Sequence, residues 1–401
     1  MEAIPILAAQ RDLLACAPTG SGKTLAFLVP ILHALKAPSR AAGLRCLIVS
    51  PTRELASQIE RHVRELAAGK PFRIAFLDKP AATHQQQQQL HHHDILIVTP
   101  MRLVKAIEQE ALSLSTVQFL VLDEADRLME HGFLEQSDLI MSSCTHPKLC
   151  TALFSATLPS HIDQLAAHVL KDSIRLTIGA VNAIPPNITQ ELLFAGSEPG
   201  KLIALRQRIA AGMDFPVLIF VQDVHRANDL YKELVYDGIR VDVIHRERSN
   251  AQREQIVEDL RTGVLWCLIC TDLMARGVDF KGIRLVINYD FPTSVATYIH
   301  RIGRTGRAGM PGKALTLFTR DDGDRLRPIV QVMLQSGTEL PEWLHKLPKL
   351  TRQRKQAIRH TPVQRAHIRA GFDGKVKLLP NGKIRGVNYR AIKKRTASES
   401  T

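Results

Sequence analysis

The segment Ala17-Pro-Thr-Gly-Ser-Gly-Lys-Thr24 decides the fold, because it places a glycine-rich turn between a predicted strand, Asp12–Ala17, and a predicted helix. Gly20 and Gly22 let backbone N–H groups turn toward an anion, and a helix N-terminus favours negative charge. We therefore predict a phosphate-binding loop made of Thr19, Gly20, Ser21, Gly22, Lys23 and Thr24. Ala17 stands where the usual pattern has glycine, and a chance glycine-rich turn is the alternative.

The side chains around this loop suit a nucleoside triphosphate bound with Mg²⁺. Lys23 can reach the β- and γ-phosphates, and the Thr24 hydroxyl can bind the metal. Asp123-Glu124-Ala125-Asp126 directly follows another predicted strand, Phe119–Leu122. A carboxylate at that edge of a parallel sheet is well placed for Mg²⁺. Asp123 is the predicted metal ligand, through water, and Glu124 the group that polarises the attacking water; a solvated acidic turn is the alternative.

Continuous apolar runs alternate with helical patterns, which predicts parallel sheets covered by helices on both faces. A first series of strands is expected at 12–17, 45–50, 95–99, 119–122 and 149–154, and a second at 217–221, 240–244, 266–270, 285–287 and 313–318. Between the series, Pro185-Pro186 marks a linker. Cys267 and Cys270 could hold zinc, but they fall inside a predicted core strand, and we expect them to be structural.

The net charge of +14 is concentrated at one end of the 401-residue chain. Residues 341–401 hold 16 Lys or Arg and 3 Asp or Glu, which leaves +1 for residues 1–340. Such a tail favours a nucleic-acid partner, and a solvated tail without a partner is the alternative. Apolar periodicity fades after Pro341, so a loosely held extension is expected. Scattered cysteines and the lack of a signal or membrane-spanning stretch predict a soluble, intracellular protein with no membrane association.

Eight motifs in order resemble those of the DEAD-box ATP-dependent RNA helicases of helicase superfamily 2. They are Ala17–Thr24, Pro51–Ala56, Thr99–Arg102, Asp123–Asp126, Ser155–Thr157, Leu218–Gln222, Thr271–Asp279 and His300–Arg307. The resemblance implies an α/β fold of two RecA-like domains, at 1–183 and 191–340, with a linker at 184–190 and a basic C-terminal extension at 341–401. It also implies ATP and Mg²⁺ as cofactors, with ATP between the domains.

The resemblance assigns further roles residue by residue. Arg304 and Arg307 would act as arginine fingers on the γ-phosphate, with a basic RNA-binding face as the alternative. Asp279 would contact the ribose, and Ser155, Thr157 and His300 would couple the nucleotide to RNA and to domain closure. RNA phosphates would be held by Pro51, Thr52, Arg53, Thr99, Arg102, Arg253 and Thr271.

Four positions depart from the family pattern. The family's glycine pair is missing from 74–90, Asn250 replaces the glutamine of a Gln-x-x-Arg pair, and Arg246 follows His245 where glycine is usual. The adenine-reading glutamine of the family would stand one residue before Met1, so we expect this chain to discriminate nucleotide bases weakly.

These features predict an RNA-dependent ATPase that unwinds short RNA duplexes or remodels RNA–protein complexes. The departures and the basic tail resemble a ribosome-biogenesis branch of the family. We therefore expect pre-rRNA as partner, a protein cofactor in a pre-ribosomal particle, small-subunit rRNA processing, a monomer, and a place in the nucleus and nucleolus. An ATP-gated RNA clamp that does not unwind is the main alternative, and a DNA helicase is a third.

Overall fold

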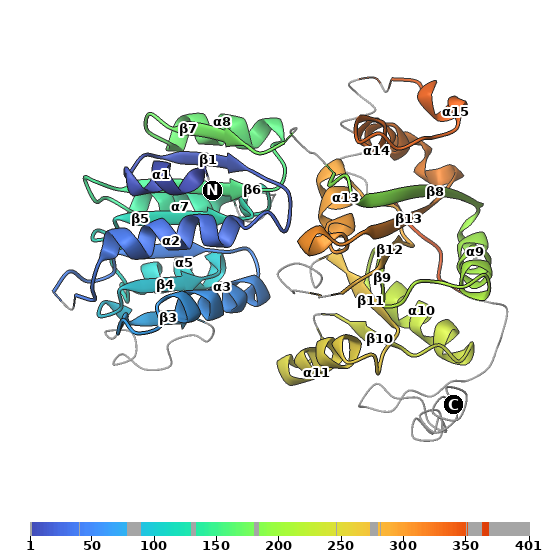
Figure 1. Ribbon diagram of the computed structural model, residues 1–401, viewed down its shortest axis with the longest axis horizontal. Coiled ribbons are helices and arrows are strands. Elements are labelled where there is room, and N and C mark those ends of the chain that lie inside the picture. Colours follow the sequence, from blue (N-terminus) through green and yellow to red (C-terminus); the bar gives the residue numbers. More distant parts are fainter. Residues whose placement is uncertain are drawn as a thin grey trace.

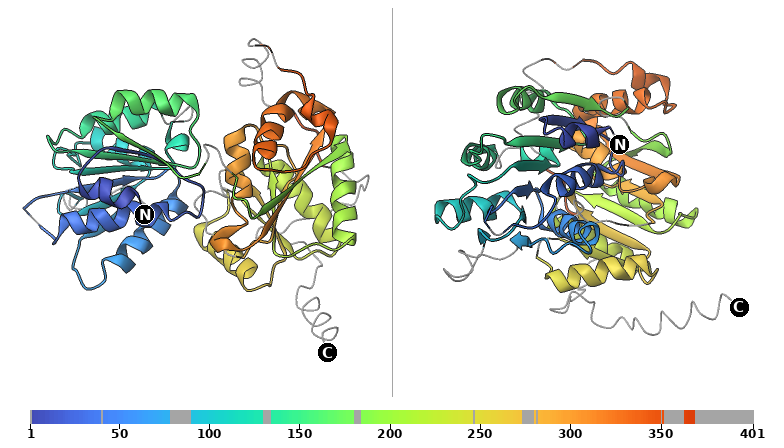
Figure 2. Two further views of the ribbon diagram at one scale, coloured as in Figure 1. Left: turned by 45° about the horizontal axis from the view of Figure 1, so that its top comes forward. Right: turned by 60° about the vertical axis from the view of Figure 1, so that its left-hand side comes forward.

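The computed structural model describes residues 2–39, 41–77, 90–129, 134–179, 184–245, 247–272, 280, 282–349, 351 and 363–368. Two parallel sheets form two bodies that lie side by side, as Figure 1 shows. Helices cover both faces of each sheet (Figure 2). The predicted α/β class with two RecA-like domains is confirmed. No helix in the described ranges combines the length and apolar character needed to cross a membrane.

The first sheet has seven strands in the order β3-β4-β2-β5-β6-β1-β7. Its strands are β1 (Leu13–Cys16), β2 (Cys46–Val49), β3 (Ile74–Leu77), β4 (Ile95–Val98), β5 (Phe119–Asp123), β6 (Cys150–Ser155) and β7 (Ile174–Thr177). Its helices are α1 (Ala3–Ala8), α2 (Lys23–Leu35), α3 (Arg53–Leu66), α5 (Pro100–Glu108), α6 (Ala125–Leu128), α7 (Leu134–Ser143) and α8 (Ser160–Val169).

Two hydrophobic cores sandwich this sheet, because alternate residues of each strand point to opposite faces. Leu13 and Ala15 of β1 join the core beneath α1, α2 and α3, whereas Leu14 and Cys16 join the core beneath α5, α7 and α8. A strand buried on both faces needs a continuous apolar run, which is the pattern that the sequence shows at β1, β2, β4, β5 and β6.

The second sheet has six strands in the order β10-β11-β9-β12-β13-β8. Its strands are β8 (Ile188–Gly196), β9 (Val217–Val221), β10 (Val241–Ile244), β11 (Cys267–Thr271), β12 (Leu285–Asn288) and β13 (Gly312–Thr319). Its helices are α9 (Glu198–Ala210), α10 (Val224–Tyr236), α11 (Asn250–Arg261), α13 (Val295–Ile302), α14 (Gly323–Gln335) and α15 (Glu342–His345), with short 3₁₀ turns η1 (Arg307–Gly309) and η2 (Arg320–Asp322).

Cys267 and Cys270 lie in the central part of this sheet and face opposite ways. Cys267 belongs to the core that contains α10, and Cys270 to the core that contains α11. Side chains three positions apart on a strand point to opposite faces, so the two sulfurs do not converge on one metal. Both thiols are buried, and burial raises the pKa of Cys267 to about 12.

Two boundaries differ from the sequence-based expectation. β8 begins at Ile188, inside the segment expected as linker, because Ile188 is buried in the core with α13 and α14 and pairs with Gly312. The segment after Pro341 is not uniformly loose. Leu344 of α15 packs into the same core, and Ile368 is buried in the core around α10. Leu344 and Ile368 therefore anchor the described parts of this tail to the second domain.

Candidate nucleotide and RNA site

The predicted phosphate loop connects β1 to α2 and has the backbone that anion binding requires. Gly20 and Gly22 have φ angles of +79° and +88°, in the left-handed region. At Gly22 an added Cβ would meet nothing within 4 Å, so its conformation rather than crowding calls for glycine. The Lys23 ammonium is held in the loop, where it donates to the carbonyls of Ala17 (2.7 Å) and Pro18 (3.4 Å).

The acidic segment comes to the same edge of the sheet. β5 lies next to β6, and β6 next to β1, so Asp123 at the end of β5 is one strand removed from the phosphate loop. Burial raises the pKa of Asp123 to about 7, with Glu124 adding to the rise and Lys23 opposing it. Burial likewise lowers the pKa of Lys23, against the attraction of Asp123. The two groups therefore share one buried electrostatic environment.

Glu124 has a carboxylate oxygen aimed into this environment. The residue has φ +50°, a left-handed conformation at the start of α6, and its backbone N–H donates to Asp123 Oδ1 at 3.0 Å. Its Oε2 is buried and has no hydrogen-bond partner within the described parts of the chain. A buried carboxylate oxygen needs a cation or a hydrogen-bond donor as its partner. The oxygen atoms of Thr24, Asp123 and Glu124 therefore suit Mg²⁺ and an ordered water.

Asp126 joins the two domains through its Oδ2 atom. The Thr157 hydroxyl donates to it from the first domain, and His300 Nε2 lies 2.9 Å away from it on α13 of the second. Burial alone would raise the pKa of Asp126, but His300 and Thr157 hold it well below its usual value. Ser155 orients Thr157: its hydroxyl donates to Thr157 O at 2.7 Å and accepts from Thr157 N at 3.2 Å.

The two predicted arginine fingers follow α13, on the side of the second domain that faces the first (Figure 1). The Thr19 hydroxyl of the phosphate loop donates to Gly303 O at 3.3 Å, and a Cβ on Gly303 would lie 2.2 Å from that hydroxyl. The Cγ of Arg307 lies 3.9 Å from the position a Cβ would take on Gly20. Arg304 is buried, and its Nε donates to His300 O at 3.2 Å. The 303–307 loop therefore contacts the phosphate loop directly.

The predicted RNA-phosphate residues of the first domain gather at the ends of two neighbouring strands. β2 pairs with β4, so the starts of α3 and α5 lie side by side. Thr52 caps α3 by accepting from Leu55 N, and Thr99 precedes α5 as its N-cap residue. These starts bring together Pro51, Thr52, Arg53, Thr99 and Arg102.

Fewer of the residues predicted to contact RNA or the ribose lie in the described part of the second domain. Thr271 ends β11 and is buried, and Asp279 lies outside the described residues. Arg253 on α11 pairs with Glu54 of the first domain and donates from Nε to Arg248 O at 3.0 Å. Arg253 therefore bridges the domains beside the predicted RNA site.

Two family models match this chain in the order of its domains. The model described as DEAD/DEAH box helicase matches residues 1–165, and the model described as helicase conserved C-terminal domain matches residues 200–309. A mouse relative, probable ATP-dependent RNA helicase DDX52 of Mus musculus, is 46% identical over 408 residues, which span 100% of this chain and 68% of the relative. This chain belongs to the DEAD/DEAH box helicase family.

Another relative and a solved structure agree with this assignment. ATP-dependent RNA helicase ROK1 of Saccharomyces cerevisiae is 48% identical over 369 residues, which cover 90% of this chain. The match spans 65% of that relative's own length. The structure of DEAD-box helicase Mss116 bound to ssRNA and UDP-BeF superimposes with a TM-score of 0.73 at 27% identity, covering 89% of this chain and 76% of the other.

Two of the positions that depart from the helicase pattern, Asn250 and Arg246, adjoin residues with clear structural roles. Ser249 and Gln252 form a complete capping box at the helix N-terminus, which leaves Arg253 one residue further along. His245 is buried after β10, and burial lowers its pKa, with Arg248 adding to the effect. Asp126 was missed as a site residue by sequence reasoning, although the acidic tetrad that contains it was identified.

Proposed function

We propose that this chain is an ATP-hydrolysing RNA helicase core that separates short RNA duplexes locally or remodels RNA–protein complexes. One observation carries the proposal: the 303–307 loop of the second domain contacts the phosphate loop of the first. A triphosphate held at Thr19–Thr24 would therefore meet groups of both domains. The names of the yeast relative, ATP-dependent RNA helicase ROK1, and of the mouse relative, probable ATP-dependent RNA helicase DDX52, support this function.

Each group of the nucleotide site has a chemical role that its position permits. The backbone N–H groups of the loop and Lys23 hold the phosphates, and Thr24 and Asp123 would hold Mg²⁺. When bound, Mg²⁺ neutralises charge on the phosphate oxygens. Glu124 orients the attacking water with its buried carboxylate. Arg304 and Arg307 stabilise the negative charge that develops on the γ-phosphate, and they come from the opposite domain.

Coupling to RNA follows from the connections between these groups. Asp126 is bonded to Thr157 in one domain and to His300 in the other, and Arg253 is paired with Glu54 across the same interface. The first-domain residues that would hold RNA offer hydroxyls and guanidinium groups, which bind phosphates without selecting bases. RNA bound across both domains would therefore favour the arrangement in which the arginines reach ATP.

The proposed function predicts that RNA stimulates ATP turnover and that ATP drives strand separation. Phosphate release should be measured with and without RNA, together with displacement of a labelled strand from a short RNA duplex. Stimulated hydrolysis with displacement supports a helicase. Nucleotide-dependent RNA retention without displacement would identify a clamp, and equal action on duplex DNA would contradict RNA specificity.

For the cellular RNA, we propose pre-rRNA of the small ribosomal subunit, handled in the nucleolus within a particle that contains a protein cofactor. The supporting features are the His245-Arg246 variant, the missing glycine pair at 74–90 and the concentrated basic tail. Crosslinking of the protein to RNA in cells, followed by sequencing, tests this assignment. Recovery of mRNA or tRNA in place of pre-rRNA would reject it.

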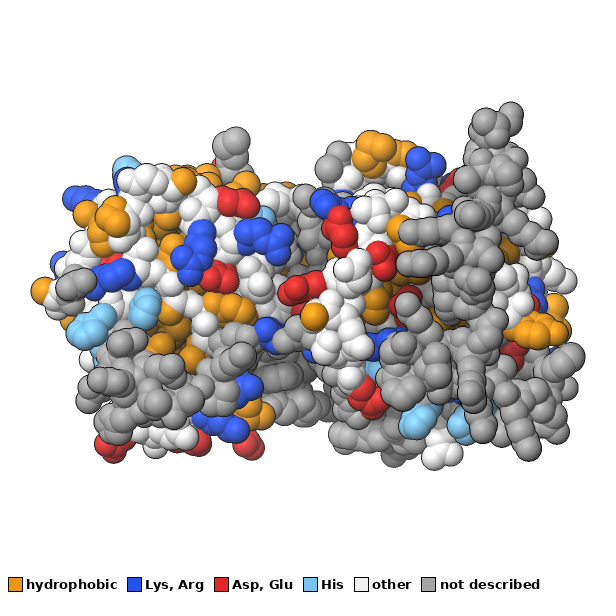
Figure 3. Space-filling view, turned by 90° about the horizontal axis from the view of Figure 1, so that it is seen from below, with side chains coloured by type: hydrophobic (Ala, Val, Ile, Leu, Met, Phe, Trp, Pro, Cys, Tyr) orange, Lys and Arg blue, Asp and Glu red, His pale blue; other side chains and the backbone are white. Residues whose placement is uncertain are grey.

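The basic tail should supply much of the attraction to RNA. On the face in Figure 3, the Lys and Arg side chains of the described residues are scattered among Asp and Glu and form no continuous patch. Residues 369–401 hold nine Lys or Arg. Removing them should reduce the magnitude of the slope of log affinity against log salt concentration by roughly 3 or more. The reason is that each contact with a phosphate of a single strand contributes about 0.7 to that slope. A full-length variant with those nine residues changed to glutamine should behave alike; an unchanged slope would exclude the tail as an RNA contact.

A further inference from the structure

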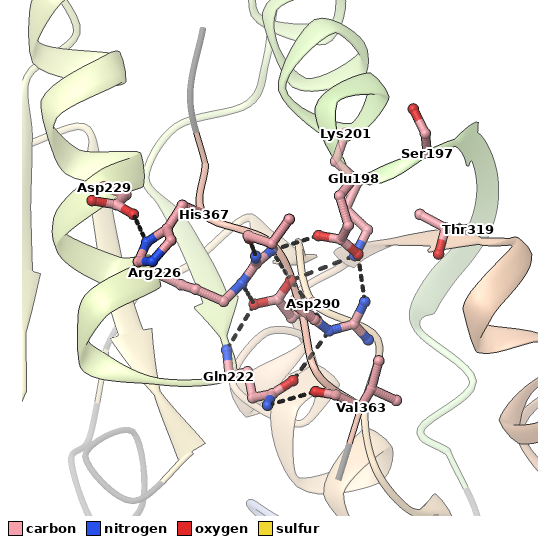
Figure 4. A network of polar contacts seen from close by, with 12 residues as sticks. Ser197, Glu198, Lys201, Gln222, Arg226, Asp229, Asp290, Thr319, Val363 and His367 are labelled. Atoms are coloured by element: carbon pink, nitrogen blue, oxygen red, sulfur yellow. Dashed lines mark hydrogen bonds and ion pairs between the residues drawn. The ribbon is translucent and has the colours of Figure 1, made fainter.

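The tail segment 363–368 lies in a buried charge cluster on the second domain. Figure 4 shows the segment passing Gln222 and Arg226, with Val363 at one end and His367 at the other. Three carboxylates and three cations meet there from parts of the chain that are far apart in sequence. They are Glu198 on α9, Asp290 after β12, Asp322 in η2, Lys201 on α9, Arg226 on α10 and Arg365 in the tail.

Arg365 is the tail residue that enters the cluster, and its side chain is 2% exposed. Its Nη1 donates to Glu198 Oε1 at 2.7 Å and its Nη2 to Asp322 Oδ1 at 2.6 Å. Its Nε donates to Gln222 Oε1 at 3.1 Å and lies 3.7 Å from Asp290 Oδ1. Each nitrogen of the guanidinium group therefore has an acceptor, and the side chain is bound more specifically than a surface arginine in a chance contact.

The backbone of the segment is held as well. Gln222 Nε2 donates to Val363 O at 3.0 Å, and Arg226 donates to Ala366 O. Ile368 is buried among the apolar residues beneath α10. Contacts with the second domain are therefore found at both ends and in the middle of the segment 363–368.

Charge balance makes Arg365 essential to this cluster. The side chains of Asp290 and Asp322 are 0% exposed. Without Arg365, the three carboxylates would lose the one cation that forms an ion pair with each of them among the pairs described. An uncompensated buried charge is strongly destabilising, whereas removal of both members of a pair is tolerated far better.

The cluster also contacts the helix that carries the proposed catalytic loop. The side chain of Asp290 faces Arg226 and Arg365, and its backbone carbonyl accepts from Arg301 Nη1 at 2.6 Å. Arg301 also forms a two-point contact with Asp272, at 2.6 and 2.8 Å. Arg301 stands in α13, directly after His300 and two residues before Gly303.

We propose that residues 363–368 are a strap that belongs to the second domain, and that Arg365 is a positioning residue. Together with Arg226, Arg365 fixes Asp290, whose backbone carbonyl binds Arg301, and so helps to keep α13 and the 303–307 loop where they meet the phosphate loop. The docking of the strap stands independently of the proposed ATPase function, whereas its effect on turnover rests on that function.

The test compares full-length variants that differ in the charge of the cluster. Arg365→Gln removes the cation that ion-pairs with Asp322, and Arg365→Gln combined with Asp322→Asn removes both members of that pair. Lys346→Ala is the matched control, because Lys346 is a tail cation whose side chain is 78% exposed. Arg365→Gln should lower the melting temperature by on the order of 10 °C, and the double variant should recover at least half of the loss.

Turnover of the same variants, measured well below their melting temperatures, tests positioning. Arg365→Gln should reduce kcat for ATP by about tenfold or more with little change in KM, since a small misplacement of a catalytic group costs rate rather than binding. A melting temperature within error of the Lys346→Ala control would overturn the strap. A lowered melting temperature with unchanged kcat, or no stability rescue in the double variant, would overturn the positioning role. If the unaltered chain hydrolyses no ATP, the proposed function fails, while the melting data still decide whether the strap exists.

Discussion

Replacing Arg307 by alanine should reduce ATP turnover by on the order of 10³-fold, with ATP affinity changed much less. The reason is its place beside Gly20 of the phosphate loop, although it belongs to the opposite domain. A guanidinium group in that position stabilises charge that develops only in the transition state, so its loss falls on kcat. Arg304→Ala should have an effect of the same order.

Two further variants make this result specific. Arg307→Lys keeps the charge but loses the planar fork, and should recover only part of the rate. Arg320→Ala removes an exposed arginine of the same domain and should leave turnover within about twofold. Rates come from phosphate release at saturating ATP and RNA, and affinities from a fluorescent nucleotide. Turnover of Arg307→Ala within threefold of the unaltered chain would show that this arginine does not act on the phosphates.

The sequence predicted the central strands well because their burial on both faces leaves a continuous apolar run. β1, β2, β4, β5 and β6 all lie inside the first sheet and were all expected. The strands β3 and β7 were missed, and both lie at edges of the first sheet, as β8 does in the second. An edge strand is only partly covered: β7 is half-buried along most of its length, and β8 alternates buried with exposed residues at its start. Local pattern alone separates such segments poorly from loops.

The parts of the site that adjoin a strand end were predictable, and the parts assembled across the chain were not. Asp123 ends β5, and the loop that carries Lys23 directly follows β1, so parallel topology dictates a common edge for both. Asp126 acquires its partners from Thr157 and from His300, which is 174 positions away. Arg365 was placed in a loosely held basic extension because composition is all that the sequence offers there. Its burial depends on carboxylates from three separate elements that only the folded domain brings together.

Glu124→Gln should nearly abolish ATP turnover, by roughly 10² to 10⁴-fold, while ATP and RNA binding stay within about threefold. The substitution keeps the size and shape of the side chain, so the left-handed turn at the start of α6 should persist. It replaces a carboxylate oxygen that is buried and unpartnered in the described structure by an amide that accepts a proton far less readily. The loss should therefore appear in the chemical step.

Asp123→Asn provides the contrast, because it alters the neighbouring carboxylate that would hold Mg²⁺. That variant should weaken Mg²⁺-dependent nucleotide binding, so raising the Mg²⁺ concentration should recover part of its activity. Glu124→Gln should gain nothing from added Mg²⁺, since its metal ligand is intact. Nucleotide affinity and single-turnover rate, each measured across a range of Mg²⁺ concentrations, separate the two cases. If Glu124→Gln loses ATP binding, or if Mg²⁺ restores its turnover, then Glu124 serves the metal and some other group must orient the water.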